Sequence, residues 1–162
     1  VAILYTQYSY FVHNKFGIDC LALQIPIGEG PDFEGVIDLL KMKEIRWDAE
    51  SEGEKFTESD IDASRLEKAK EWREKLVDMV ASSDDKLAEI YLEGGEISND
   101  QLKKAIRNGT INRTFVPFVM GSARHNQGVQ PLIDAVVDQR PRPLDVPAKK
   151  GDNVKKDKEE EV

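Results

Sequence analysis

The 162-residue chain carries 23 basic and 31 acidic side chains, which gives a formal net charge of -8 at pH 7. A chain of this length can bury one ordinary core, and its acidic balance argues against non-specific nucleic-acid binding through a basic surface. A single cysteine, Cys20, excludes an internal disulfide and fits a reducing cytosol.

The first predicted element is a helix near the start of the chain. Apolar residues recur at roughly helical spacing at Tyr5, Tyr8, Phe11 or Val12, and Phe16, and Gly17 offers a C-terminal stop. The aromatic and β-branched content also permits a strand. The apolar run over residues 1–12 is far shorter than the ~20 residues of a membrane span. We therefore expect neither a membrane anchor nor a targeting segment, and a sequence that begins inside a longer protein.

Strand patterns follow. Residues 20–27 have the pattern of one buried strand, and residues 28–31 form a Gly- and Pro-containing turn. Residues 33–40 and 42–47 are rich in β-branched and aromatic side chains, which predicts two further short strands. The polar residues 48–55 are expected to form a hairpin loop.

A long helix is predicted over residues 64–82. Ser64 and Glu67 have the spacing of a capping box at its start. Trp72 belongs to an apolar stripe on one face, which predicts a core position for this residue. The other members of the stripe are Leu66, Ala69, Leu76 and Val80.

Two more helices are predicted after it. One spans residues 84–93 and stops at a pair of glycines, and the next begins with Ser98 capping towards Gln101 and ends near Gly109. Three successive helices would form a layer against the preceding strands.

The last part of the chain returns to a strand over residues 115–120, a loop over 121–128 and a helix over 128–137. Prolines make residues 140–147 extended. Residues 149–161 carry blocks of charge with almost no apolar content, so we expect a mobile end.

The loop reads Gly-Ser-Ala-Arg-His-Asn-Gln-Gly from Gly121 to Gly128. A loop between a strand and a helix is how nucleotide-binding α/β domains present backbone N–H groups to a ligand. The phosphate-binding pattern Gly-x-x-x-x-Gly-Lys-[Ser/Thr] occurs nowhere in this chain. The sequence therefore predicts one part of a nucleotide site and not the whole.

Other reactive side chains are expected to have ordinary roles. His125 should be an exposed loop residue, His13 a surface or helix-packing residue, and Cys20 an inert thiol in a buried strand. We assign no catalytic residue and no metal ligand, because two histidines and one cysteine show no ligand spacing. The paired carboxylates are expected to be solvated; they are Asp84 with Asp85, Asp60 with Asp62, and Glu50 with Glu52.

Several short stretches occur in a fixed order between residues 16 and 151. They are Leu-Gln-Ile-Pro-Ile-Gly (23–28), Phe-Glu-Gly-Val-Ile-Asp (33–38) with Met42-Lys43, Tyr-Leu-Glu-Gly (91–94), Gly-Ser-Ala (121–123) with Asn-x-Gly-Val-Gln (126–130), and Asp-Ala-Val-Val (134–137) with Pro-Leu-Asp-Val-Pro (143–147). In this order and spacing they resemble translation elongation factor G, the GTPase family that promotes ribosomal translocation of tRNA and mRNA.

The resemblance implies an α/β fold that is a partial P-loop GTPase domain, with its last strand and helix and an inserted α+β subdomain of short strands and about three helices. The implied units are the end of a preceding GTP-binding-domain helix (1–17), the insert (18–112), the final strand, guanine loop and helix (113–140), and an extended linker with a mobile tail (141–162).

The resemblance also implies what lies upstream of Val1: the phosphate loop, the Mg²⁺-binding switch regions, the catalytic histidine and the Asn-Lys-x-Asp guanine motif. The sequence 14–17 imitates that motif for two residues, but Gly17 stands where a carboxylate is needed. GTP and magnesium would therefore belong to the longer protein, and we expect this chain alone to be inactive.

Within the loop, the resemblance implies that the Ala123 N–H reaches the guanine oxygen, that the Ser122 hydroxyl braces an upstream aspartate, and that Gly121 permits the turn. The insert would meet the C-terminal domain of the ribosomal stalk protein through charged helical faces over 67–78 and 86–104. The implied partners are the ribosome and the remainder of the factor, in the cytoplasm, without sequence-specific nucleic-acid binding.

Three other interpretations remain open at this point. The chain could be a stand-alone acidic protein-binding adaptor without nucleotide chemistry, which would leave the Gly-Ser-Ala loop unexplained. It could be a small-molecule enzyme, although it lacks a nucleophile with a partner base, a metal set and a phosphate loop. The loop could also be a generic turn in which Ser122 caps the backbone.

Overall fold

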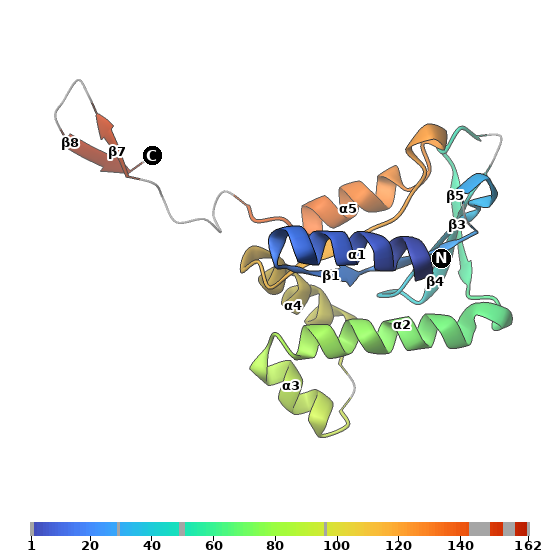
Figure 1. Cartoon of the computed structure of the whole chain (residues 1–162), viewed down its shortest axis with the longest axis horizontal. Helices are drawn as coiled ribbons and strands as arrows, with labels where there is room; N and C mark the ends of the chain where they lie inside the picture. The colour runs from blue at the N-terminus through green and yellow to red at the C-terminus, as the bar shows by residue number, and fades with distance from the viewer. Residues whose placement is uncertain are drawn as a thin grey trace.

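The computed structural model describes residues 2–28, 30–48, 51–95, 97–142, 150–153 and 158–161 (Figure 1). Its α-helices are α1 (Ala2–Phe16), α2 (Ala63–Ala81), α3 (Asp85–Leu92), α4 (Asn99–Ile111) and α5 (Val129–Gln139). Its strands are β1 (Asp19–Ala22), β2 (Gln24–Ile27), β3 (Gly35–Asp38), β4 (Lys43–Trp47), β5 (Phe56–Asp60), β6 (Phe115–Phe118), β7 (Lys150–Asn153) and β8 (Lys158–Glu161). Short 3-10 turns occur at Gly30–Asp32 and Ala123–His125. The expected mixed α/β architecture is confirmed.

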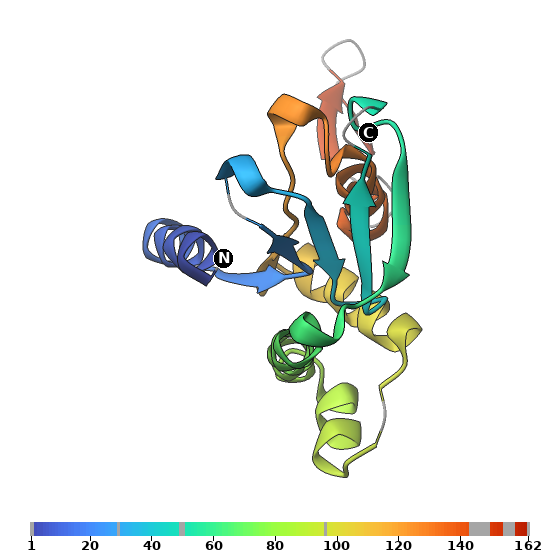
Figure 2. The same cartoon turned by 90° about the vertical axis from the view of Figure 1, so that its right-hand side faces the viewer.

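Two sheets organise the body of the molecule. Strands β2, β3, β4 and β5 form an antiparallel sheet in chain order, and β1 pairs with β6 in parallel. Figure 2 shows the four-stranded sheet beside α5. Helices α2 and α3 lie below the lower end of the sheet in this view. A separate antiparallel hairpin joins β7 to β8, where the sequence predicts a mobile segment, and Figure 1 shows it apart from the other elements.

The single strand expected over residues 20–27 is wrong, because the chain changes sheets at Leu23. The Leu23 N–H donates to the Phe118 carbonyl at 2.9 Å, and the Leu23 carbonyl accepts from the Leu39 N–H at 3.0 Å. These two bonds keep the backbone of Leu23 paired while β1 turns into β2. All of residues 20–25 are buried, so the apolar run contains no exposed position that would mark the break.

The main core lies between the strands and the helices α2 and α4. On α2, Ala69, Leu76 and Val80 are buried as the apolar stripe predicts, and Trp72 packs against them while half-buried. The other buried members of this core are Leu21, Ala22, Leu23, Ile25, Ile27, Ile37, Leu39, Leu40, Ala81, Leu87, Leu102, Ala105, Ile106 and Phe115.

The helix starts confirm one capping prediction and correct another. At α4 the Ser98 hydroxyl accepts from the Gln101 N–H and the Gln101 side chain accepts from the Ser98 N–H, which is the expected capping box. At α2 the cap is Asp62 and not Ser64, because the Asp62 carboxylate accepts the Ser64 N–H at 2.9 Å.

Helix α4 ends slightly later than the predicted end near Asn108 and Gly109. The helix continues to Ile111, and the ring of Phe115 occupies the space where a Cβ on Gly109 would lie. The chain turns instead at Arg113, which has a φ of 60°, while the Thr114 N–H donates to the Gly109 carbonyl at 2.8 Å. Gly109 is therefore a packing glycine and not a helix stop.

Helix α1 agrees with the sequence prediction and strand β5 does not. Helix α1 forms as predicted and ends at Gly17, whose φ is +66°. Strand β5 was not predicted, and all five of its residues are exposed. Its sequence, Phe-Thr-Glu-Ser-Asp, has no buried face to mark it, so its pairing with β4 defines it.

Candidate functional site

The Gly-Ser-Ala loop connects the end of β6 to the start of α5, as the sequence predicts. Two backbone hydrogen bonds close its base: the Ser122 N–H donates to the Gln127 carbonyl at 2.9 Å, and the Gln127 N–H donates to the Ser122 carbonyl at 3.1 Å. Between them the chain makes a single 3-10 turn and reverses at Asn126, which has a φ of 53°. The loop is therefore a small closed structure with its own hydrogen bonds.

Ala123 is the exposed first residue of the 3-10 turn in this loop. Its side chain faces solvent, and among the described residues no acceptor is found for the Ala123 N–H. Ser122 is half-buried and makes no side-chain capping bond to the turn, so the generic-cap interpretation finds no support here. His125 is exposed, as expected.

The chain before the loop is anchored on a second, smaller core. Val36, Ile45 and Trp47 are buried together under Phe33 and Met120. The Met120 N–H donates to the side-chain oxygen of Gln24, at 3.2 Å. Gln24 is itself buried, so this bond satisfies a polar atom that water does not reach.

The chain after the loop is joined to the β4–β5 connection. Gln130, in the first turn of α5, accepts from the Trp47 indole N–H at 3.3 Å and donates from its amide nitrogen to the Gly53 carbonyl at 2.9 Å. A cleft of about 650 Å³ lies between this connection and the loop, with Phe33, Arg124 and Asn126 among its lining residues. Both views in Figures 1 and 2 place the loop beside the β4–β5 connection.

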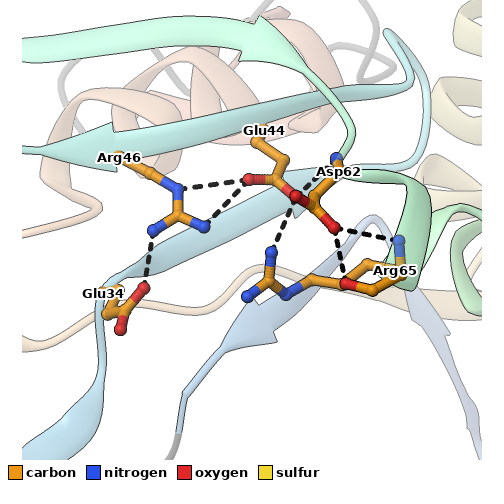
Figure 3. Close-up of polar contacts among 6 residues, drawn as sticks. Glu34, Glu44, Arg46, Asp62 and Arg65 are labelled. Atoms are coloured by element: carbon orange, nitrogen blue, oxygen red, sulfur yellow. Dashed lines mark hydrogen bonds and ion pairs between the residues drawn. The ribbon is translucent and has the colours of Figure 1, made fainter.

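A cluster of charged side chains stabilises the other end of β4. The Glu44 side chain is 3% exposed and accepts from both Nε and Nη2 of Arg46, each at 3.1 Å. Its second oxygen accepts from the Asp62 N–H at 3.1 Å and from Arg65 at 3.4 Å (Figure 3). Arg46 also donates to Glu34 at 2.6 Å. Because guanidinium groups occupy the carboxylate, this cluster connects β4 to the start of α2.

The single thiol is buried. Cys20 is 3% exposed on β1, and burial, with a smaller contribution from the Asp19 carboxylate, raises the pKa of its thiol. A neutral, buried thiol is a poor nucleophile and a poor metal ligand. Over the described ranges, no group of three or more His, Cys, Asp or Glu side chains is arranged to hold a metal ion.

Helix α5 presents apolar side chains to solvent. Ile133 is 56% exposed and Val137 is 63% exposed, with Leu132 and Val136 also exposed beside them. The β1–β6 sheet to which this helix is connected has only two strands in the described part of the chain. Exposed apolar side chains gathered on one helix are typical of a surface that packs against another part of a protein.

Sequence analysis did not predict the contacts of several residues around the loop. Nothing in the local pattern connects Trp47 with Gln130, which are 83 residues apart, and Gly53 carries no motif. Gln24 and Glu44 are polar residues inside strand patterns, and a strand with one exposed face would also contain polar residues. Both side chains are buried, which distinguishes them from exposed strand residues. Their burial depends on hydrogen-bond partners distant in the sequence.

None of the helices in the described part of the chain combines the length and apolar character needed to cross a bilayer. A comparison with models of protein families finds no match.

Curated proteins do match. The chain is 50% identical over 146 residues to elongation factor G 1 of Treponema denticola, and 50% identical over 145 residues to elongation factor G 2 of Treponema pallidum. It is 48% identical over 150 residues to elongation factor G of Aquifex pyrophilus. These alignments cover 90–93% of this chain and 21–22% of each relative, so the chain spans about one fifth of the length of the curated relatives it matches.

A crystal structure of a protein from Thermus thermophilus has the same fold over 86% of this chain and 20% of its own, with a TM-score of 0.72 and 24% sequence identity. This match supports the arrangement of the elements described above. The sequence matches disfavour the adaptor interpretation, because the alignments with elongation factor G cover at least 90% of this chain.

Proposed function

We propose, from the premise that this chain is a segment of an elongation factor G, that it gives the longer protein its guanine-reading loop and a ribosome-docking insert. The longer protein would be a cytoplasmic GTPase that promotes translocation of tRNA and mRNA. Residues 113–140 would be the final strand, guanine loop and helix of its GTP-binding domain, and residues 18–112 the insert. Residues 1–17 would end the preceding helix, and 141–162 would form the linker and tail.

The single observation that carries the guanine-reading role is the Ala123 N–H, for which no acceptor is found among the described residues, in an exposed residue of a loop that bonds its Ser122, His125, Asn126 and Gln127 N–H groups internally. A guanine oxygen is an acceptor and fits this donor, whereas adenine presents an amino donor at the same position. Gly121 would allow the turn, and the half-buried Ser122 hydroxyl would brace an aspartate of the upstream guanine motif.

Most affinity for GTP would come from outside this segment. Phosphates and magnesium supply most of the binding energy for such nucleotides, and the residues that hold them are expected in other parts of the longer protein. The exposed apolar side chains of α5 suit packing against those parts. We therefore propose that this chain alone binds GTP too weakly to hydrolyse it.

The insert would dock on the C-terminal domain of the ribosomal stalk protein. Helices α2, α3 and α4 carry many exposed charges, including the pairs Lys70–Glu67 at 3.2 Å and Lys75–Glu71 at 2.6 Å. Exposed charges of both signs suit a transient, salt-sensitive contact. No nucleic acid is proposed to bind here.

A proline substitution tests the guanine-reading role. Ala123→Pro removes the backbone N–H, and the turn tolerates it because Ala123 is the first residue of the turn and Ser122 is extended, with a φ of -115° and a ψ of 98°. Ala123→Gly keeps the N–H and is the matched control. In the complete factor, the ratio of the dissociation constants for 2-aminopurine riboside diphosphate, which lacks the guanine oxygen, and GDP is measured by isothermal titration.

The wild type and Ala123→Gly should prefer GDP by at least about tenfold, because 2-aminopurine lacks the guanine N1–H as well as the oxygen. Ala123→Pro should lower that preference by about tenfold, which is the value of the one hydrogen bond it removes. Equal ratios in all three proteins would show that this loop does not read the guanine oxygen.

A further inference from the structure

We infer that Gln130 is a positioning residue: it fastens the guanine loop to the β4–β5 connection of the insert, so that the insert sets the nucleotide specificity of the longer protein. This inference rests on the proposed guanine-reading role and extends it to residues outside the loop. It is carried by the contacts that join α5, Trp47 and Gly53.

The orientation of the Gln130 amide is fixed by chemistry. The Trp47 indole nitrogen can only donate and the Gly53 carbonyl can only accept, so the Gln130 oxygen must face Trp47, at 3.3 Å, and its nitrogen must face Gly53, at 2.9 Å. Gln130 is two residues beyond Gly128, where the loop ends, so its position is transmitted to the loop by one turn of backbone.

Trp47 is a rigid anchor for this contact. It is 7% exposed on β4, its ring stacks on Phe33 with centroids 6.5 Å apart, and Phe56 packs on it with centroids 6.3 Å apart. Both Trp47 and Met120, the residue before the loop, belong to the same small core. The loop is thus held at its start by packing and at its end by hydrogen bonds to one patch of the insert.

Gly53 brings the insert into direct contact with the loop. Its φ is +84°, and a Cβ there would lie 2.6 Å from the Asn126 carbonyl carbon and 2.8 Å from the His125 carbonyl oxygen. Only a glycine permits this approach. The insert backbone therefore packs on the backbone of the 3-10 turn, within four residues of Ala123.

The test measures specificity and not affinity alone. Gln130→Met keeps the length of the side chain and removes both hydrogen bonds. Gln101→Met is the matched control, because it removes the capping bonds of another glutamine at the start of α4. The complete factor carrying each substitution is titrated with GDP and with 2-aminopurine riboside diphosphate, after circular dichroism has established that each protein is folded.

In the wild type and Gln101→Met, GDP should be preferred by at least about tenfold. Gln130→Met should reduce that preference at least threefold, while affinity for the 2-aminopurine nucleotide, which makes no contact with the Ala123 N–H, should change less than twofold. Gly53→Ala, which pushes the insert off the loop, should reproduce this selective loss.

The outcomes are separable. A wild-type preference near one would refute the guanine-reading role, and the positioning role with it. A preserved wild-type preference that survives both Gln130→Met and Gly53→Ala would refute the positioning role alone. An equal loss in Gln101→Met would show that general destabilisation of the insert causes the effect, and would also overturn the inference.

Discussion

Gly128 lies directly against Gly121 across the base of the Gly-Ser-Ala loop. A Cβ on Gly128 would lie 2.8 Å from the Gly121 Cα and 2.9 Å from the Met120 carbonyl oxygen, and the φ of Gly128 is +91°. The two ends of the loop therefore meet through backbone alone, and the closure depends on the absence of a side chain at this position.

Gly128→Ala should destabilise the chain by about 2–4 kcal/mol, because it adds a steric clash to the strain of a positive φ. Gly94→Ala is the matched control: Gly94 has a φ of +73°, but nothing lies within 4 Å of its added Cβ. The control should lose about 1 kcal/mol, for the backbone conformation alone. Urea denaturation measures both values, and similar losses would contradict the close approach.

Glu44→Ala should destabilise the chain by about 2 kcal/mol, because it leaves the Asp62 N–H without its acceptor and separates β4 from α2. The estimate is modest since Arg46 and Arg65 are each more than one third exposed and regain water. Glu58→Ala, which breaks an exposed pair with Lys41, should change stability by less than about 0.5 kcal/mol. Equal losses by urea denaturation would mean that the Glu44 cluster does not connect the two elements.

The Asp62 cap predicts a dependence of stability on pH. Hydrogen bonds from the Ser64 hydroxyl and then the Ser64 N–H lower the pKa of the Asp62 carboxyl in the folded protein. A carboxyl with a lowered folded pKa stabilises above its unfolded pKa of about 3.9 and loses that contribution as pH falls through its folded value.

Asp62→Asn keeps a capping oxygen but does not titrate. Its urea midpoint should therefore fall less than that of the wild type between pH 5 and pH 2.5. If the two midpoints fall in parallel, Asp62 does not contribute to the acid sensitivity, which would then belong to other carboxylates with lowered pKa, such as Asp60 beside Lys43 and Glu71 beside Lys75.

Cys20 should react with a thiol reagent such as Ellman's reagent only when the protein opens. Burial raises the pKa of its thiol, so both access and thiolate content are low at pH 8. The absorbance change in native buffer should be slow and should become immediate in denaturant. Rapid reaction in native buffer would show that β1 is exposed in solution.

The local parts of the fold were predictable from the sequence because their determinants lie within a few residues. Gly17 ends α1, Ser98 with Gln101 starts α4, and the Trp72 stripe faces the core. The prediction was wrong at the start of α2, where Asp62 and Ser64 are both possible caps. Asp62 accepts the Ser64 N–H, so the Ser64 capping box does not form.

The remaining errors concern partners far along the chain. The break at Leu23 depends on the Phe118 carbonyl and the Leu39 N–H, and a glycine is required at position 109 inside α4 because the Phe115 ring fills the space of a Cβ. The candidate site also has a local part and a distant part. The sequence predicts the loop from its motif, but no local pattern predicts the Trp47–Gln130 contact that supports it.

The parallel pairing of β1 with β6, from Asp19 opposite Phe115 to Ala22 opposite Phe118, restricts how this segment could be shortened. Parallel neighbours cannot be joined by a tight hairpin and need a crossover of about a dozen residues or more. Any deletion engineered between them must therefore leave enough chain to return to the opposite end of the strand. A minimal version of this protein would have to replace the excised residues with a crossover connection and not with a tight turn.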